Sequence, residues 1–273
     1  MAKQIKDMSF LDHLEELRWH LIRSTFAILI VAIVAFVMKD FVFNTIMFAP
    51  KDPNFFTYRF LCNVSKLLHA DGLCIEEIPF TFQSLAMAEQ FSVHIWTSIT
   101  VGFIIAFPYI IFEFWKFMSP GLYKEERKNA KLFIFISSVL FFIGVLFGYY
   151  VVTPLSVNFL GSYSISDQVE RNIKIGSYIA LLRSSVLASG LIFELPIIIY
   201  FLSKMGLVTP KFLKTYRKHA LVLVLILAAV ITPPDIISQI IVAIPILILY
   251  EISIKISKIV EKNLQKKDAG LRK

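Results

Sequence analysis

The chain has 273 residues and a formal net charge of +8; 57% of the residues are hydrophobic, only 18% are charged, and the mean hydropathy is +0.70. Soluble proteins carry about 25% charged residues, and a soluble fold of this length has too little interior for so many Phe, Ile and Leu side chains. The composition therefore excludes a soluble enzyme, a disordered chain and a secreted disulfide scaffold.

Long charge-free runs predict an all-α integral membrane protein with six transmembrane helices in a single domain, residues 1–257. The longest run, residues 132–166, contains no Asp, Glu, Lys or Arg, and a hydrocarbon core about 30 Å thick needs about 20 apolar residues per helix. An amphipathic helix over about 9–19 precedes the spans, and residues 258–273 form a basic tail. The predicted spans are 20–38, 90–112, 132–153, 177–202, 219–234 and 236–253, the last two being short.

The positions of the basic residues predict that both termini are cytoplasmic. Of the 28 lysines and arginines, 21 fall in the N-terminal segment, the second-to-third loop, the fourth-to-fifth loop and the tail. These segments lie on one side of the membrane in the six-span topology, which is the cytoplasmic side by the positive-inside rule. Topology thus explains the net charge, and no nucleic-acid partner is expected. The first span is interpreted as retained, because no small-residue cleavage site follows it.

Cysteines and prolines mark the loops and turns of this topology. Cys62 and Cys74 both lie in the first external loop, about residues 39–89. An oxidising outer compartment permits a disulfide between them, and two reduced thiols are the alternative. Structural turns are predicted at the prolines and at one aspartate, namely Pro50, Pro108, Pro120, Pro196, Pro233, Pro234 and Asp235.

Polar residues at membrane depth are costly and are therefore candidates for function. Glu194 lies between apolar residues, two positions before Pro196. Arg183 lies three helical turns earlier on nearly the same face, about 16 Å away by helix geometry. One hypothesis is a polar stripe that lines a water-accessible cavity; the alternative is a buried glutamate satisfied by a neighbouring helix.

Two charged segments on the cytoplasmic side are further candidates. The segment from Ser9 to Arg18 has apolar residues on one face and Glu15, Glu16 and Arg18 among its charges, a pattern typical of a helix at the membrane interface. Residues 116–128 contain a Pro-Gly turn followed by two glutamates among basic residues. Ordinary pairing on a solvated surface is the alternative for the first segment, and a solvated helix start, taken alone, explains the second segment better than a binding site does.

Signatures of catalysis are absent from the chain. It contains no His-Glu-x-x-His, Gly-x-Ser-x-Gly or Walker sequence. The five histidines are scattered without the spacing of metal ligands. No enzyme activity, cofactor or metal site is therefore expected.

Several motifs in order along the chain resemble those of the TatC family, the multi-spanning receptor subunit of the twin-arginine protein translocase. The first is His-Leu-Glu-Glu-Leu-Arg at 13–18, and the second runs from Pro108 through Phe-Met-Ser-Pro-Gly-Leu-Tyr-Lys-Glu-Glu-Arg at 117–127. Phe-Glu-Leu-Pro at 193–196, Thr-Pro-Pro-Asp at 232–235 with Gln239, and Ala-Ile-Pro at 243–245 follow. The ordered set covers about residues 9–257.

The resemblance implies a receptor for signal peptides that carry consecutive arginines. By position, Glu126 would pair with a signal arginine and Phe117 would shape the same site, while Glu16 and Arg18 match the N-terminal motif. Because carboxylates bind guanidinium groups through bidentate hydrogen bonds, Glu126 and Glu16 could meet two adjacent arginines. Glu15 precedes Glu16, so either of the two could make the second contact.

The resemblance also implies partners and a location. Single-span TatA/TatB-type subunits would contact the intramembrane polar residues Glu194, Arg183 and Gln239, and copies of the chain would associate in the complex. The protein would lie in the lipid bilayer of the bacterial cytoplasmic membrane and support export of folded proteins driven by the proton-motive force. The alternative function is a proton-coupled secondary transporter that uses Glu194 and Arg183. A purely structural membrane scaffold is the second alternative.

Overall fold

A computed structural model describes residues 10–68, 74, 78–119, 130–166, 168, 170–232 and 235–271. The described chain is almost entirely helical, apart from two strands of three residues each. It divides into two compact units. The first consists of Met1–Lys39 and His94–Val139, and the second of Asp40–Val93 and Leu140–Lys273.

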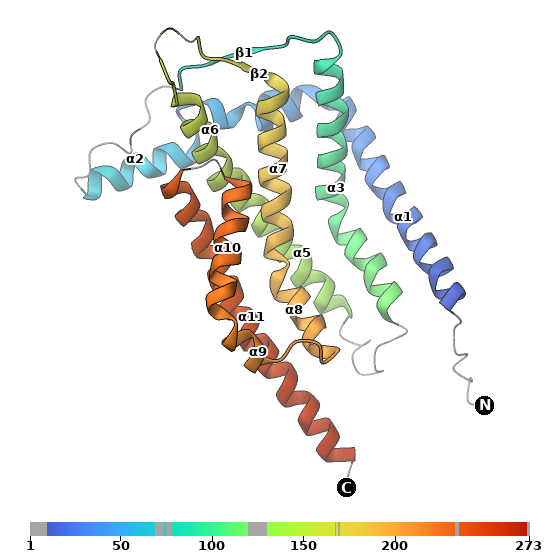
Figure 1. Ribbon diagram of the computed structural model, residues 1–273. Coiled ribbons are helices and arrows are strands. Elements are labelled where there is room, and N and C mark those ends of the chain that lie inside the picture. The colour runs from blue at the N-terminus through green and yellow to red at the C-terminus, as the bar shows by residue number, and fades with distance from the viewer. Residues whose placement is uncertain are drawn as a thin grey trace. The chain divides into compact units, whose positions relative to one another are not determined.

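The first unit is built on two long helices, α1 (Phe10–Val37) and α3 (Glu89–Met118) (Figure 1). The start of α5 (Ala130–Phe147) also belongs to this unit. Gly102 allows α1 and α3 to pack closely, because a Cβ atom there would lie 2.6 Å from the carbonyl oxygen of Ile28. Nearer the α1 C-terminus, the rings of Phe36 and His94 stack with centroids 3.9 Å apart. Apolar burial and close packing thus hold the middle and one end of this helix pair together.

The second unit contains the rest of α5 and the later helices of the described chain. After α5 the chain continues through the π-helical turn η4 (Gly148–Val152) into α6 (Thr153–Ser162). The later helices are α7 (Ile175–Phe193), α8 (Leu195–Lys204), α9 (Pro210–Thr215), α10 (Arg217–Ile231) and α11 (Ile236–Leu271). Their buried core includes Val152, Val224, Ala228, Val242, Ala243 and Ile246.

Small residues let α5 and α7 approach closely within the second unit. A Cβ atom added at Gly144 would lie 2.6 Å from the carbonyl oxygen of Ser189, and one at Gly148 would lie 2.8 Å from that of Ser185. On the facing helix, Gly190 accommodates the ring of Phe141. This Gly-x-x-x-Gly spacing is typical of close helix pairs in membranes.

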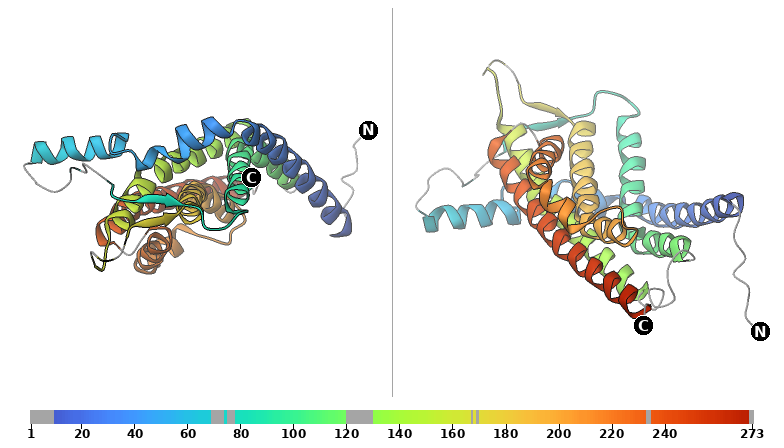
Figure 2. Two further views of the ribbon diagram at one scale, coloured as in Figure 1. Left: turned by 90° about the horizontal axis from the view of Figure 1, so that it is seen from above. Right: turned by 60° about the horizontal axis from the view of Figure 1, so that its bottom comes forward.

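One end of the second unit is closed by short elements from the segment that precedes α3. These are η1 (Phe41–Met47), η2 (Ala49–Lys51), α2 (Phe56–Leu68) and β1 (Thr81–Gln83). β1 pairs in parallel with β2 (Asn172–Lys174), with Thr81 opposite Asn172, and the two strands lie at the start of α7 (Figures 1 and 2). A disulfide joins Cys62 to Cys74.

Tyr58 and Glu89 connect this end of the unit to the helices. The buried Tyr58 hydroxyl donates its one proton in a hydrogen bond shared between the carbonyl oxygens of Pro50 and Pro154, which lie 2.9 and 3.0 Å away. Burial raises the pKa of Tyr58 above its usual value. The Glu89 carboxylate accepts hydrogen bonds from the backbone N–H groups of Leu85 and Gly176, so one side chain ties the starts of α3 and α7 together.

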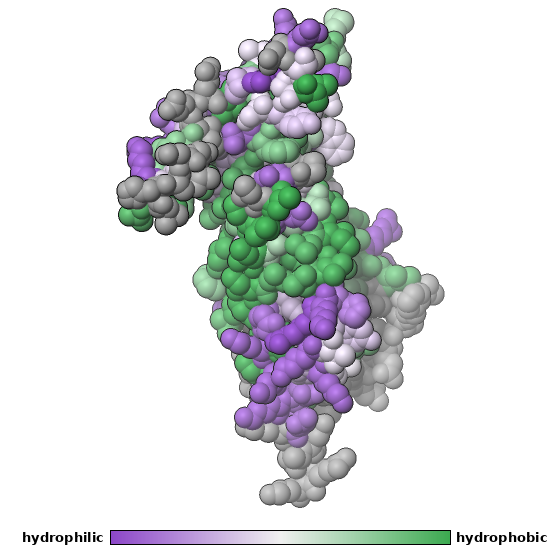
Figure 3. Space-filling model, turned by 60° about the vertical axis from the view of Figure 1, so that its left-hand side comes forward, coloured by the Kyte–Doolittle hydropathy of each residue, from purple (hydrophilic) through white to green (hydrophobic). Residues whose placement is uncertain are grey.

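Five segments of the described chain are helical, long and apolar enough to cross a membrane: Leu14–Val37, Glu89–Met118, Ala130–Ser162, Ile175–Lys204 and Ser238–Gln265. They correspond to five of the six predicted spans. Exposed apolar side chains of α10 and α11 include Leu223 and Ile248. Figure 3 shows a broad apolar band between more polar regions on one face of the molecule. Such a band is suited to contact with lipid.

The prediction that the last two helices are both short is right for α10 and wrong for α11. With 15 residues, α10 is about 22 Å long by helix geometry, less than the hydrocarbon core. In contrast, α11 has 36 residues and includes most of the segment predicted to be a tail. No proline or glycine interrupts residues 246–269, and α8 packs beside this part of α11, with Ser203 hydrogen bonded to Ser257.

Pro108 does not form the predicted turn, because it lies inside α3. A proline in a helix removes one backbone hydrogen bond, and neighbouring structure can compensate for that loss in a membrane helix. Pro50 lies in η2, and Pro196 lies in the first turn of α8. Pro120, Pro233 and Pro234 lie outside the described residues.

Candidate functional site

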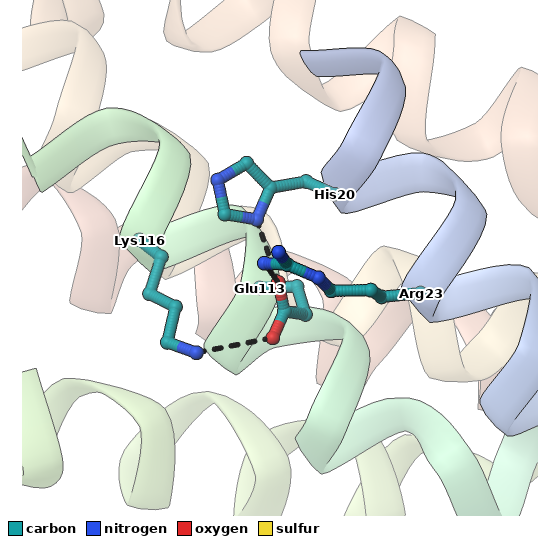
Figure 4. A network of polar contacts seen from close by, with 4 residues as sticks. All are labelled: His20, Arg23, Glu113 and Lys116. Carbon is teal, nitrogen blue, oxygen red and sulfur yellow. Dashed lines mark hydrogen bonds and ion pairs between the residues drawn. The ribbon is translucent and has the colours of Figure 1, made fainter. Parts of the chain in front are cut away.

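The most concentrated polar cluster described in the first unit surrounds the buried carboxylate of Glu113 on α3. Its Oε2 atom lies 2.6 Å from His20 Nδ1 and 3.6 Å from Arg23 Nη1, both on α1. Its Oε1 atom lies 3.2 Å from Lys116 Nζ, one turn later on α3. Figure 4 shows these three side chains converging on the carboxylate.

Helical spacing explains how two distant segments build this cluster. His20 and Arg23 are three residues apart, so both project from one face of α1. Glu113 and Lys116 have the same spacing on α3, and the Tyr109 hydroxyl, one turn earlier, faces the same carboxylate. The close packing of α1 against α3 then brings the two faces together.

Burial makes these contacts energetically necessary. The Glu113 side chain is 2% exposed, whereas those of Arg23 and Lys116 are 52% and 45% exposed. A buried carboxylate without partners is strongly destabilising. The hydrogen bonds and ion pairs of the cluster therefore favour one arrangement of α1 on α3, while the two cations keep part of their surface accessible.

Phe117 lies beside this cluster, as its ring meets that of His20 edge-on at a centroid distance of 6.2 Å. Glu16 is one turn before His20 on α1 and is half-buried, whereas Glu15 and Arg18 are exposed. The structure thus brings Phe117 close to the helix face that carries Glu16. Glu126 lies outside the described residues.

A shallow, open groove of ≈ 490 Å³ lies along one face of α1 from Leu14 to Leu29 and is lined by residues of this helix alone. Its walls include Leu14, Leu17 and Leu21, together with the charged Arg18. Leu14 and Leu21 are 44% and 59% exposed. An apolar surface next to a charge can bind an extended or helical peptide segment that carries both apolar and polar side chains.

The predicted intramembrane polar residues lie in the second unit. Glu194 is buried at the junction of α7 and α8, where its backbone carbonyl accepts hydrogen bonds from the first turn of α8. Arg183 is half-buried in the middle of α7, and its Nε atom is buried without a hydrogen-bond partner. Eleven residues of helix separate the two, about 16 Å along the axis.

Gln239 and Asp235 make contacts within the second unit. The Gln239 amide donates a hydrogen bond to the carbonyl oxygen of Leu225, which ties α11 to α10. Asp235 Oδ2 accepts hydrogen bonds from both the backbone N–H and the hydroxyl of Ser238. This is a helix cap, which satisfies a free donor at the start of α11. Gln239 therefore has an internal role in addition to any contact with a partner.

Sequence reasoning missed Glu113 and its partners. His20 is one of five histidines without metal-ligand spacing, and Glu113 follows directly after a charge-free run, so neither residue stands out in the sequence. Two local signals are present, namely a basic pair at 20 and 23 and a charged pair at 113 and 116, each spaced by three residues near an end of a predicted span. That they meet could not be inferred, because 93 residues separate His20 from Glu113.

Comparison of the chain with known proteins identifies its family. The family model described as "Sec-independent protein translocase protein (TatC)" matches residues 12–245. The chain is 41% identical over 264 residues to the Sec-independent protein translocase protein TatC of Blattabacterium sp. subsp. Periplaneta americana (strain BPLAN), covering 96% of this chain and 99% of that one. It is 33% identical to TatCy of Bacillus subtilis (strain 168), covering 98% and 96%.

Two solved structures that resemble this fold come from the same family as these relatives. The fold is similar to that of a protein titled "Crystal Structure of Twin Arginine Translocase Receptor- TatC", with a TM-score of 0.65, 32% identity, and coverage of 91% of this chain and 99% of that one. A second structure of that receptor, in DDM, matches with a TM-score of 0.68 and 34% identity over 90% of this chain and 99% of that one.

Proposed function

The chain belongs to the TatC family of Sec-independent protein translocase proteins, and we propose that it is the receptor that binds twin-arginine signal peptides of folded cargo. The resemblance inferred from the sequence motifs is thereby confirmed at the level of the family. Members are membrane components of a protein translocase, and no enzyme activity is indicated. The residues that bind the signal peptide are part of the proposal.

We place the signal-peptide site at the end of α3 and the start of α1. Glu126 and Glu16 are the proposed carboxylate partners of the two arginines, and Phe117 is proposed to shape the same site. The observation that carries this placement is the contact of Phe117 with His20, one turn after Glu16. This contact brings the motif at residues 13–18 close to the motif that begins at Pro108, and both lie in the first unit. Arg18 and Glu15 complete the charged face of α1.

Carboxylates suit this task because each can accept two parallel hydrogen bonds from a guanidinium group. A lysine ammonium offers a single point charge and no fork. Two adjacent arginines therefore need two carboxylates in fixed relative positions, and a Lys-Lys sequence gains less from the same pair. The apolar groove beside Arg18 offers a surface for the apolar part of a signal peptide.

The remaining parts of the proposal concern partners, energy and location. Single-span TatA/TatB-type subunits would contact Glu194, Arg183 and Gln239 within the bilayer, and copies of the chain would associate. The proton-motive force would drive export of folded proteins. We place the protein in the bacterial cytoplasmic membrane with both termini inside, an orientation supported by the distribution of its basic residues.

Binding of synthetic signal peptides to the purified full-length protein in nanodiscs tests the proposed function. An Arg-Arg peptide should bind at least tenfold more tightly than its Lys-Lys counterpart, as hydrogen bonds to charged groups contribute about 1.5–3 kcal/mol each. Glu126→Ala should remove most of this preference, and Glu261→Ala, at a half-buried glutamate on α11 far along the chain from both motifs, serves as the matched control. Equal binding of both peptides to the unmodified protein would contradict the receptor function.

A further inference from the structure

We infer that Glu113 is a positioning residue of the signal-peptide site, because it holds the part of α1 that carries Glu16 against the part of α3 that carries Phe117. The inference rests on the proposed function and deepens it. Glu113 lies within the motif of residues 108–127, but it is not among the residues proposed to contact the signal peptide. Its role follows from burial and from the contacts it makes across the helix pair.

Glu113 is too deeply buried to be a contact for a peptide. Its side chain is 2% exposed, and both carboxylate oxygens already have partners. The cations around it, Arg23 and Lys116, are half-exposed and separate it from the surface. It therefore acts through its neighbours, by fixing where they lie.

The contact with His20 couples Glu113 to both proposed binding elements. His20 Nδ1 lies 2.6 Å from the carboxylate, and the His20 ring also meets Phe117 edge-on. Glu16 is one helical turn before His20, so its position follows that of His20. A loss of the Glu113 charge would release His20 and Arg23 together and allow the start of α1 to move relative to Phe117.

The rest of the helix pair is held by different interactions. Gly102 packs against Ile28 and Ala32 in the middle of the pair, about 16 Å from Glu113 by helix geometry. Beyond it, His94 stacks on Phe36 and its Nε2 atom lies 3.0 Å from the Phe36 carbonyl oxygen. Loss of the Glu113 cluster should therefore loosen one end of the pair and leave the other end in place.

The test compares Glu113→Gln, which keeps the size of the side chain and removes its charge, with Gly102→Ala. The second substitution disturbs the same helix pair away from the cluster, because the added Cβ would meet the Ile28 carbonyl. Three quantities are measured in nanodiscs: the thermal stability of each variant, its affinities for Arg-Arg and Lys-Lys peptides, and distances between spin labels. One label pair is at the exposed positions Leu21 and Phe114, and the other is at Val37 and Trp96.

We expect Glu113→Gln to weaken Arg-Arg binding by about tenfold, in keeping with the cost of a misplaced binding group, and to reduce the preference for Arg-Arg over Lys-Lys. The Leu21–Phe114 distance distribution should broaden while the Val37–Trp96 distribution stays unchanged. Gly102→Ala should lower thermal stability and retain the preference. A Glu113→Gln variant with unmodified peptide preference would overturn the inference, as would an equal loss of preference in Gly102→Ala. Absence of any preference in the unmodified protein would instead contradict the proposed function.

Discussion

His20 Nδ1 lies 2.6 Å from Glu113 Oε2, although 93 residues separate the two along the chain. The pair joins α1 to α3 where the two helices carry Glu16 and Phe117. Around it, the contacts of Arg23 and Lys116 compensate the buried carboxylate. The proposed receptor site is thus built on a closely packed helix pair with a buried ion cluster, and a geometrically selective site requires support of this kind.

Neutralising Glu16 should weaken signal-peptide binding more than neutralising Glu15. Glu16 is half-buried on the face that leads to His20, whereas Glu15 is exposed. We expect Glu16→Gln to reduce affinity for an Arg-Arg peptide by about tenfold or more, since a charged hydrogen bond is lost, and Glu15→Gln to change it about twofold at most. Fluorescence anisotropy with a labelled peptide measures both. A larger effect at Glu15 would assign the second arginine to that residue.

Glu194 separates the receptor function from the alternative of a proton-coupled transporter. In a receptor, Glu194→Gln should leave binding of the Arg-Arg peptide within about twofold and impair export, since the buried carboxyl lies in the second unit and not in the proposed peptide site. The measurements are peptide affinity and export of a folded reporter in cells. A small-solute flux that depends on Glu194 and is indifferent to Glu126 and Glu16 would favour the transporter.

Gly144 should tolerate no larger residue. A Cβ atom there would lie 2.6 Å from the Ser189 carbonyl oxygen and 2.8 Å from Phe193 Cβ, so Gly144→Val forces α5 and α7 apart. Overpacking of this kind costs about 1–3 kcal/mol, which should appear as a lower thermal unfolding temperature in detergent. Leu146→Val, at an exposed position two residues later, is the control. Equal unfolding temperatures for the two variants would refute the close packing.

The disulfide between Cys62 and Cys74 should report on membrane orientation. If the loop is outside, as proposed, both thiols are oxidised in cells and react with maleimide only after reduction. Under the chain-entropy model a loop of this length stabilises the protein by about 3 kcal/mol, so Cys62→Ser should lower the unfolding temperature. Mass spectrometry of the alkylated protein checks the redox state. Free thiols in freshly isolated membranes would argue against an external loop.

Ionisation of Tyr58 should lower the free energy of unfolding at alkaline pH. Burial raises the pKa of its hydroxyl above the value in the unfolded chain, about 10, because the folded state favours the neutral form. Its stabilising effect is therefore complete below about pH 10 and is lost as the pH rises from there towards the folded-state pKa. Tyr58→Phe should be less stable at pH 8, since the hydrogen bond shared between two carbonyl groups is lost. Its free energy of unfolding should also fall less steeply above pH 10, as measured by chemical denaturation.

The amino-acid sequence by itself determined the class of the protein, its family and the location of most helices. These properties follow from local patterns, because each apolar run must satisfy its own backbone hydrogen bonds in lipid and each motif is contiguous. The break at Glu194 and Pro196 could be anticipated for the same reason. The continuation of α11 to Leu271 could not, because it depends on packing beside α8.

Only the tertiary structure decided which distant residues meet. The Glu113 cluster, the close packing of Gly144 on α7 and the link from Glu89 to Gly176 each join residues from different helices. Spacing in the sequence shows which residues share a helix face, but it does not show which residues they meet on another helix, because a single buried charge or glycine is compatible with many neighbours. Its partner is selected by how the helices pack, and packing depends on the whole set of apolar surfaces that each unit must bury.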